Sequence, residues 1–459
     1  MKARYLTAVG LAAALAVAGC SSNNSNNTGS KASPTDTTTT SAASTTPATT
    51  APAESSAPSV DTTSGTLDVW LMTGEVSTKT SDAVTAEFHK QFPNVQVKIE
   101  IQQWGGIGAK LTTALGSDTP PDVMEIGNTD VPQFAASGGL LDLAPMKGDF
   151  ENSDNWLAGL ADPAKVGDSL YGVPLLAGDR AVIYNKKMFA AAGITNPPTS
   201  VDELKADAAL LKAKNTASDF SPLYLPGQYW YAGIAMVWDN GGQIATTDGS
   251  KWTGALESDG AQAGLAEFKD LQNSLSTKAS QTVNTNQPDQ DTIIGAGKAA
   301  MIIGGSWEPG AVVKDSNGAL TDDDLGAFCF PSINAGKCAP VFLGGSDIAV
   351  AKNSKHQDWA VAWIKAMTNT AGQTALQAND GLMPNATNLL SLGSSGPAAA
   401  WYAAAATSSG TPASAGWATI EGDATMENMF SAIASGAKSP MDAAKAADSH
   451  LNDVLNATS

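Results

Sequence analysis

The folded part of this chain begins with the stretch Thr66-Leu-Asp-Val-Trp-Leu-Met72, which decides its fold class. This short apolar run ends before Gly74 and is typical of a buried strand in a parallel sheet. Residues 81–91 follow with apolar side chains at helical spacing, and Pro93 ends that helix. Residues 95–101 then alternate apolar and polar side chains, which predicts a second strand. The order strand, helix, strand indicates an α/β fold.

The same alternation continues along the chain. We predict further strands at 122–126, 181–184, 299–303 and 348–350, and further helices at 110–115, 131–137, 201–214, 261–275 and 358–368. Trp359, Trp363 and Met367 recur at helical spacing and are expected to face the core. Residues 66–459 are too many for one hydrophobic core, so we expect two lobes, each a doubly wound sheet flanked by helices.

The composition excludes several classes of protein. The chain has 459 residues, with 26 Lys and Arg against 45 Asp and Glu, a formal net charge of −19. This acidity argues against electrostatic binding to nucleic acid or to anionic lipid headgroups. The three His and three Cys are widely scattered, which argues against a metal site, and no cofactor is expected. The sequence contains no G-x-S-x-G, HExxH, complete phosphate loop or G-x-G-x-x-G motif, so we do not expect an enzyme.

The N-terminal segment is typical of an exported protein. Lys2 and Arg4 precede an apolar run that is too short to span a bilayer comfortably, so residues 1–19 are interpreted as a signal peptide. The run ends in Val-Ala-Gly-Cys20, which resembles the bacterial lipobox, and Cys20 is expected to carry lipid. Ordinary signal cleavage with a spare cysteine is the alternative. Residues 20–65 are rich in Ser, Thr, Asn and Pro and predict a disordered tether.

Cys329 and Cys338 flank the segment 330–337, which contains Pro331 and Gly336. In an exported protein this pattern predicts a local disulfide across a hairpin-like loop. Two free thiols are the alternative.

Several segments, in this order and at these separations, resemble the extracellular solute-binding proteins of bacterial sugar ABC importers, the maltose-binding-like family 1. The most specific is Leu170-Tyr-Gly-Val-Pro174 followed by Ile183-Tyr-Asn-Lys-Lys-Met-Phe189. The other segments that carry the resemblance are Thr66–Met72, Lys110–Val123, Ala135–Leu143, Pro197–Leu204, Ala299–Glu308 and Phe342–Val350. Together they cover almost the whole folded part of the chain.

The resemblance implies a two-lobed periplasmic-binding-protein fold of type II. In this fold two α/β lobes are joined by a hinge of three crossings, and the ligand binds in the cleft between them. Mapped onto this chain, the N-terminal lobe is expected at 66–175 plus 348–384, and the C-terminal lobe at 176–347 plus 385–459. Closure about such a hinge is a known switching mode, for which periplasmic binding proteins are a standard example.

A sugar offers flat C–H patches to aromatic rings and hydroxyls to carboxylates, amides and Arg. Such side chains are expected in loops after the strands, where open α/β sheets bind ligands. Trp307 is the strongest candidate, because the corresponding Trp of family members often stacks on the sugar. Tyr231 is equally well explained as core and is not among the candidates. The predicted ligand-binding residues are Glu75, Trp104, Asn128, Asp130, Asp179, Arg180, Tyr229, Trp230, Trp307, Glu308, Gly345, Ser346, Asp347 and Trp417.

The resemblance implies that the protein captures a carbohydrate, expected to be a di- or oligosaccharide, and delivers it to the permease subunits of an ABC importer. It would work as a monomer, lipid-anchored at the extracellular face of the cell membrane. A binding protein for a polyamine, peptide or amino acid is the first alternative. A lipid-anchored glycan hydrolase and a sensor component are the others.

Overall fold

The computed structural model describes residues 60–396 and 398–457, which lie in one unit spanning Pro58–Ser459. The predicted signal peptide, the predicted lipidation site Cys20 and most of the predicted tether fall outside the described residues. Within those residues, no helix is both long and apolar enough to cross a membrane. The same part of the chain shows no group of three or more His, Cys, Asp or Glu side chains placed to hold a metal ion.

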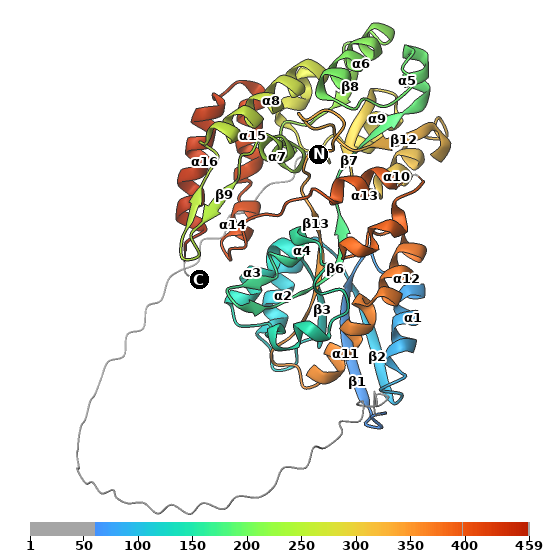
Figure 1. The fold of residues 1–459 in the computed structure, drawn as a ribbon, viewed down its shortest axis with the longest axis vertical. Coiled ribbons are helices and arrows are strands. Elements are labelled where there is room, and N and C mark those ends of the chain that lie inside the picture. The colour runs from blue at the N-terminus through green and yellow to red at the C-terminus, as the bar shows by residue number, and fades with distance from the viewer. Residues whose placement is uncertain (1–59, 397, 458–459) are drawn as a thin grey trace, which may run out of the picture. The chain divides into compact units, whose positions relative to one another are not determined.

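The first lobe is built on a five-stranded sheet with the order β2-β1-β3-β13-β6 (Figure 1). Its strands are β1 (Gly65–Met72), β2 (Val95–Gln102), β3 (Val123–Gly127), β6 (Val173–Gly178) and β13 (Gly344–Val350). The strands β1, β2 and β3 are parallel, as the alternation of strand and helix predicts. The strand β13 runs antiparallel to both of its neighbours, because it returns to this sheet from the second lobe.

The helices of the first lobe bury apolar side chains in the core of the lobe, on this sheet or on one another. They are α1 (Thr78–Phe88), α2 (Ile107–Leu115), α3 (Val131–Ala136), α4 (Ala158–Ala161), α11 (Gln357–Thr368) and α12 (Thr370–Asp380), with a small hairpin of β4 (Lys165–Val166) and β5 (Ser169–Leu170). Ser77 begins α1 by accepting a hydrogen bond from the backbone of Thr80. Trp363 and Met367 of α11 are fully buried in the lobe core, as their spacing predicts.

The second lobe contains a four-stranded sheet with the order β12-β7-β11-β8. Its strands are β7 (Ala181–Asn185), β8 (Ser221–Tyr224), β11 (Ala299–Gly304) and β12 (Leu325–Phe328), and the pair β9 (Ala245–Thr247) and β10 (Trp252–Gly254) forms a separate hairpin. The strands β8 and β11 are parallel, whereas β7 runs antiparallel to β11 and to β12. The two mixed α/β sheets confirm the predicted fold class.

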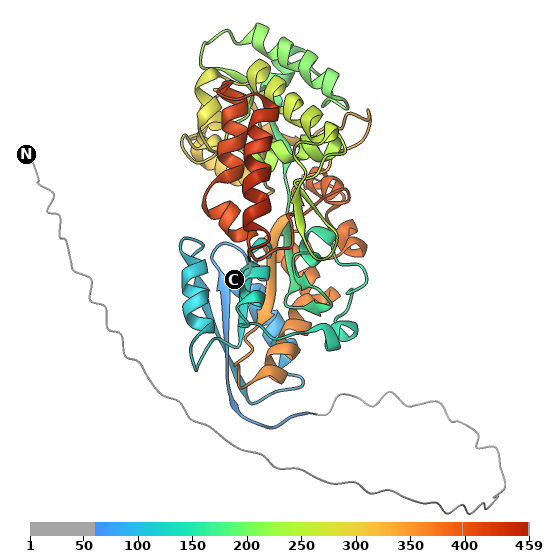
Figure 2. The ribbon, with the colours of Figure 1, turned by 90° about the vertical axis from the view of Figure 1, so that its left-hand side faces the viewer.

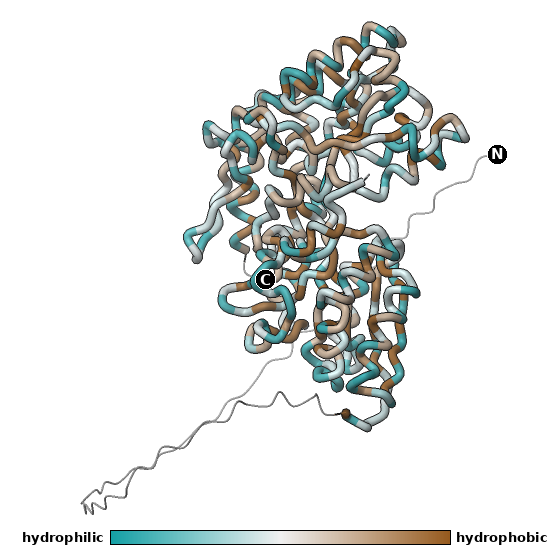
Figure 3. The backbone as a smooth tube through the Cα atoms, turned by 45° about the vertical axis from the view of Figure 1, so that its right-hand side comes forward, coloured by the Kyte–Doolittle hydropathy of each residue, from teal (hydrophilic) through white to brown (hydrophobic). Residues whose placement is uncertain are grey.

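Helices surround the second sheet and also make up most of the C-terminal part of the chain. They are α5 (Lys186–Ala192), α6 (Val201–Lys214), α7 (Trp230–Asp239), α8 (Asp259–Leu275), α9 (Gln290–Gly295), α10 (Glu308–Asp315), α13 (Ala399–Ala405), α14 (Trp417–Gly422), α15 (Thr425–Ser435) and α16 (Pro440–Val454). The red helices α15 and α16 lie side by side in Figure 2 and pack on α8. Along the tube of Figure 3, hydrophobic and hydrophilic stretches alternate in the outer helices, as expected when one face of each helix is buried.

The chain passes from the first sheet to the second at Asp179–Arg180 and returns at Leu343. The expected lobe boundaries at 175/176 and 347/348 therefore fall inside β6 and β13, whose backbone pairing keeps both strands in the first sheet. The third expected boundary, 384/385, precedes Ala386 and Leu389, which pack in the core of the first lobe. We propose that the lobes divide at Asp179–Arg180, at Leu343 and after Gly393.

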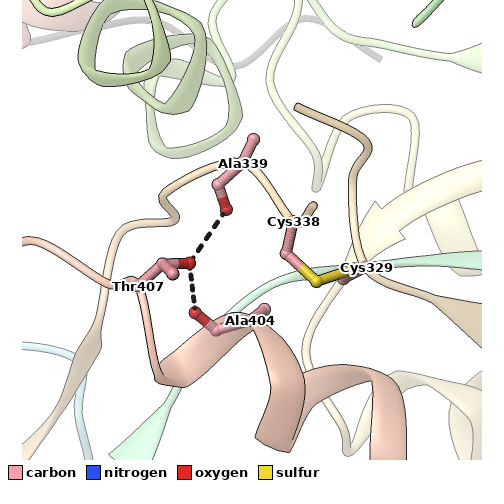
Figure 4. The surroundings of a disulfide bond; sticks show 5 residues. All are labelled: Cys329, Cys338, Ala339, Ala404 and Thr407. Carbon is pink, nitrogen blue, oxygen red and sulfur yellow. Dashed lines mark hydrogen bonds between the residues drawn. A yellow bond between two sulfur atoms is a disulfide. The ribbon is translucent and has the colours of Figure 1, made fainter. Parts of the chain in front are cut away.

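A disulfide joins Cys329 and Cys338, with the two Cα atoms 5.5 Å apart (Figure 4). The enclosed loop is hairpin-like, because Ala339 donates its backbone N–H to the carbonyl of Phe330 at 2.8 Å. Beside the bridge, the Thr407 hydroxyl donates to the carbonyls of Ala339 and Ala404 (Figure 4). The bridge therefore closes the loop after β12, and the Thr407 hydrogen bond connects the end of this loop to the segment after α13.

Candidate ligand-binding cleft

A cavity of about 620 Å³ opens between the two lobes, at the carboxyl ends of β1 and β3 and beside the hinge strands. Its volume lies within the range of about 300–1,000 Å³ that is usual for small-molecule sites. The residues that line it are Thr73, Gly74, Glu75, Trp104, Gly127, Asn128, Thr129, Asp130, Leu176, Ala177, Gly178, Arg180, Tyr231, Trp307, Phe342, Gly344, Gly345, Ser346 and Leu382. Eight of the fourteen predicted ligand-binding residues are among them.

The wall from the first lobe consists of residues that directly follow parallel strands. Glu75 follows β1, Trp104 follows β2, and the short 3-10 helix Asn128–Asp130 follows β3. Because the carboxyl ends of parallel strands meet at one edge of a sheet, these side chains converge on the cleft. Trp104 is 39% exposed, so much of its ring is available to a ligand.

Asn128 and Asp130 differ in how many of their hydrogen-bonding groups already have partners within the protein. The Asn128 side chain is buried and donates to the carbonyls of Gly159 at 2.9 Å and Leu343 at 3.3 Å, so it fastens the hinge to the cleft wall. Asp130 accepts one hydrogen bond, from Gln133 at 3.3 Å. Burial raises the pKa of the Asp130 carboxyl above its ordinary value.

The wall from the second lobe is aromatic. Tyr231 in α7 and Phe342 before β13 lie with ring centroids 4.6 Å apart, and Trp307 follows β11 with 53% of its surface exposed. The backbone passes close under Trp307, since a Cβ on Gly178 would lie 3.1 Å from its ring. Glycine at position 178 therefore lets the Trp307 ring lie against the hinge strand.

Arg180 lies among these three rings. Its guanidinium carbon is 4.8 Å from the centroid of Tyr231, 5.4 Å from Phe342 and 5.9 Å from Trp307. One guanidinium nitrogen donates to the carbonyl of Gly178 at 3.3 Å, and Nε has no acceptor among the described residues. Arg180 therefore combines cation–π contacts with unused donors at the hinge, where both lobes meet.

One side-chain hydrogen bond lies at the floor of the cleft and another lies at its rim. On the floor, the Ser346 hydroxyl donates to Glu75 Oε2 at 3.3 Å. At the rim, the Thr129 hydroxyl of the first lobe donates to Glu421 Oε2 in α14 of the second lobe at 3.0 Å. Burial, followed by the charge of Asp130, raises the pKa of Glu421 to about 7.

Three predicted aromatic candidates, Tyr229, Trp230 and Trp417, do not line the cleft. Trp230 and Trp417 are almost completely buried and meet edge to face in the second-lobe core, with ring centroids 5.8 Å apart. The expectation that these ligand-binding candidates lie in a loop after a strand is wrong for Trp230, which begins α7. Tyr229 is the buried residue just before this helix. The partly exposed position in this cluster belongs to Tyr231, whose ring contacts Phe342.

Three predicted acidic candidates also lie off the cleft. Glu308 turns back onto its own loop, where its carboxylate accepts from the backbone of Gly305 at 3.2 Å and from Gln290 at 2.7 Å. It thereby shapes the turn that carries Trp307. Asp179 is buried at the crossing between β6 and β7, and Asp347 is buried within β13. Burial raises the pKa of both carboxyl groups well above the ordinary value.

The cleft residues that the sequence did not point to include Thr129, Tyr231, Phe342 and Leu382. Thr129 lies between two predicted residues, so its place after a strand was a usable signal. Tyr231, Phe342 and Leu382 come from separate parts of the chain, and only the tertiary packing brings them together.

Two α/β lobes with an interlobe cleft of aromatic rings and hydrogen-bonding groups define a two-lobed ligand-binding protein of the periplasmic type. More narrowly, the chain belongs to the bacterial extracellular solute-binding proteins, whose family model matches residues 74–374. This membership confirms the resemblance found in the sequence.

Individual relatives agree with this assignment. The chain is 38% identical to the diacetylchitobiose binding protein DasA of Streptomyces coelicolor over 396 residues, which cover 85% of this chain and 90% of that protein. The GacH receptor of Streptomyces glaucescens, studied with and without acarbose, is 25% identical with a TM-score of 0.68, over 86% of this chain and all of that one. The sugar-binding protein MalE of Xanthomonas citri shares the fold, with a TM-score of 0.71 at 22% identity over 85% of this chain and 97% of that one.

Proposed function

We propose that this protein captures a carbohydrate in the interlobe cleft and delivers it to the permease of an ABC importer. The observation that carries this proposal is the composition of the cleft. Trp104 from one lobe and Trp307 and Tyr231 from the other supply ring faces, while Asp130 and Arg180 supply an acceptor and donors. Flat apolar faces with hydrogen-bonding groups at their edges match the surface of a sugar ring.

The first ligand to test is an N-acetylated disaccharide. Among the relatives compared, DasA shares 38% identity over most of both chains, and its name states that it binds diacetylchitobiose. The cavity of about 620 Å³ lies within the usual range for small-molecule sites, so it is compatible with a disaccharide. Maltose and malto-oligosaccharides are the next candidates, because structural neighbours bind them.

Binding without chemistry is the activity that we infer. The family consists of solute-binding proteins, and a ligand that touches both lobes stabilises the closed arrangement because only that arrangement offers all of its contacts. A permease that recognises the closed arrangement would then receive loaded protein. Anchoring by lipid on Cys20 at the extracellular membrane face and a monomeric state belong to the same proposal.

The experiment is a thermal-shift and calorimetric screen of the purified protein against diacetylchitobiose, maltotriose, cellobiose, spermidine and a mixture of amino acids. A ligand at a hundredfold excess over Kd adds roughly 2.7 kcal/mol to the free energy of unfolding. We expect a large shift with one family of sugars and no change in the sugar after incubation. A shift with spermidine or amino acids alone would overturn the carbohydrate assignment, and release of monosaccharides would favour a glycan hydrolase.

A further inference from the structure

The turn that carries Trp307 holds the indole directly on the protein backbone. This turn runs from Gly304 at the end of β11 to Glu308 at the start of α10. A Cβ on Gly305 would collide with the Trp307 ring, and a Cβ on Gly178 of β6 would lie 3.1 Å from it. Trp307 is nevertheless 53% exposed and lines the cleft. The position of the indole in the cleft therefore depends on the position of this turn.

Glu308 closes the turn through its backbone and through its side chain. Its backbone N–H donates to the carbonyl of Gly305 at 3.1 Å, and its Oε1 accepts from the backbone N–H of Gly305 at 3.2 Å. Its Oε2 lies against the last residue of β11, since a Cβ on Gly304 would collide with this oxygen. The carboxyl group therefore joins both ends of the turn, and Trp307 lies between the residues that it joins.

Gln290, the first residue of α9, holds the carboxyl group of Glu308 from outside the turn. The residue is 3% exposed, and its Nε2 donates to Glu308 Oε2 at 2.7 Å and to the carbonyl of Ile303 in β11 at 3.0 Å. A carbonyl can only accept, so the contact with Ile303 fixes which end of the amide faces the turn. Gln290 Oε1 is buried and has no donor among the described residues, so the side chain is held through its nitrogen. Gln290 itself is not among the residues that line the cleft.

Two other neighbours hold the end of β11 and the ring. Trp401 of α13 donates from Nε1 to the carbonyl of Gly304 at 2.8 Å, which fixes the last residue of the strand. The guanidinium carbon of Arg180 lies 5.9 Å from the centroid of the Trp307 ring. Between these two contacts, the hydrogen bonds of Gln290 and Glu308 fix the course of residues 305–308.

We propose that Gln290 is a positioning residue that acts through Glu308 to hold the Trp307 indole in place for a sugar ring. The contacts run from α9 through one amide and one carboxyl group to a glycine turn, and they end at the exposed ring. A ring that is held in place before binding loses less conformational freedom when the ligand arrives, and this raises the affinity. The proposal rests on the proposed function for the sugar that contacts Trp307, whereas the position of the ring does not depend on that function.

A double-mutant cycle tests whether Gln290 acts through Trp307. Gln290→Met keeps the approximate length of the side chain and removes its donors. The Kd for diacetylchitobiose is measured by calorimetry for the wild-type chain, Gln290→Met, Trp307→Ala and the double variant. We expect Gln290→Met to weaken binding about fivefold when Trp307 is present, the worth of one net hydrogen bond, and to have no further effect on Trp307→Ala. An equal loss in both backgrounds, or no loss in either, would overturn the proposal.

Gln272→Met is the matched control. Gln272 of α8 is completely buried, and its Nε2 donates to Ser280 Oγ at 2.9 Å and to the carbonyl of Leu225 at 3.5 Å. Its Oε1, like that of Gln290, has no donor among the described residues, and Gln272 does not line the cleft. We expect this variant to lower Tm as Gln290→Met does and to leave the Kd unchanged. A loss of affinity as large as that of Gln290→Met would assign the effect to general destabilisation and overturn the proposal.

Fluorine NMR tests the position of the ring without any ligand. The chain has 11 Trp residues, which are all labelled as 5-fluorotryptophan, and the Trp307 resonance is the one that Trp307→Phe removes. We expect Gln290→Met to shift or broaden this resonance and Gln272→Met to leave it unchanged. A Trp307 resonance that is identical in Gln290→Met and in the wild-type chain would overturn the proposal.

The two experiments separate this proposal from the proposed function. If no sugar binds the wild-type chain, the proposed function fails, and the fluorine spectra still decide whether Gln290 positions the ring. If Gln290→Met does not fold, as judged by circular dichroism, Glu308→Gln takes its place in both measurements. That variant keeps the length of the side chain but leaves one acceptor oxygen for two donors, so the same changes are expected and their absence overturns the proposal.

Discussion

The replacement Asp347→Asn should make the protein more stable at neutral pH, although it removes a carboxyl group from the centre of the hinge. Asp347 is fully buried in β13, and neither of its oxygens has a hydrogen-bond donor among the described residues. A Cβ added to Gly172 would lie only 2.9 Å from the Cβ of Asp347, so the backbone at Gly172 lies close against this side chain. Burial alone raises the pKa of this carboxyl well above the ordinary value of 3.8.

The sign of the effect follows from the protons bound in each state. Above pH 4 the unfolded chain releases the proton of Asp347, whereas the folded chain keeps it until the pH reaches the raised pKa. The folded state therefore binds more protons, and the free energy of unfolding falls by about 1.4 kcal/mol per pH unit for this one carboxyl. Asparagine has a similar shape and does not titrate, so the advantage of Asp347→Asn should grow by about 1.4 kcal/mol for each pH unit until the raised pKa is reached, and it should be larger at pH 7 than at pH 5.

Urea unfolding followed by tryptophan fluorescence at pH 5, 6 and 7 measures this change. The exposed Asp118→Asn serves as a control and should shift the free energy of unfolding equally at each pH. If the difference between Asp347→Asn and the wild-type chain is the same at pH 5 and pH 7, Asp347 is ionised in the folded protein. The reasoning from burial would then be wrong.

Three further predictions concern the cleft, the hinge and the disulfide. Trp307→Ala should weaken binding of the best sugar about tenfold, or about 1.4 kcal/mol, with little change in Tm, because the ring is 53% exposed; unchanged affinity by calorimetry would exclude stacking. Gly345→Ala should cost more than about 1 kcal/mol of stability, since φ is 137° and the new Cβ would collide with the Leu176 carbonyl oxygen. The control Gly108→Ala, which meets nothing within 4 Å, should not destabilise the protein. Replacing Cys329 and Cys338 by Ser should cost about 2–3 kcal/mol in urea unfolding for a separation of 9 residues, and a midpoint equal to that of the wild-type chain would contradict this.

The sequence was sufficient for the part of the cleft that depends on one sheet. Glu75, Trp104 and Asp130 each follow a parallel strand, and the rule that such strands end at a common edge places them together without knowledge of the rest. The antiparallel return of β13 was not visible, because a strand pattern carries no information about its direction.

Residue type alone was not sufficient for the aromatic wall. Trp230, Tyr231 and Trp417 are equally suited to stack on a sugar, but Trp230 and Trp417 fill the core and Tyr231 faces the cleft. Whether each of these rings is buried or faces the cleft depends on how α7 packs against α14, α15 and the segment at Phe342. These elements are far apart in the sequence. The same holds for Asp179, whose burial follows from the crossing of the hinge strands.

Under the proposed function, the hydrogen bond between Thr129 and Glu421 affects how often the protein would meet an ATP-driven importer without a solute. A bond of this kind contributes about 1 kcal/mol, which multiplies the ratio of shut to open empty protein by about five. A stronger interlobe bond would raise the affinity for the solute. It would also increase the fraction of solute-free protein in the closed arrangement, which the transporter could not tell from loaded protein. Each of those encounters risks a futile cycle. Under the proposed function, the Thr129–Glu421 bond favours the closed empty protein only slightly, so that the solute supplies most of the free energy of closure.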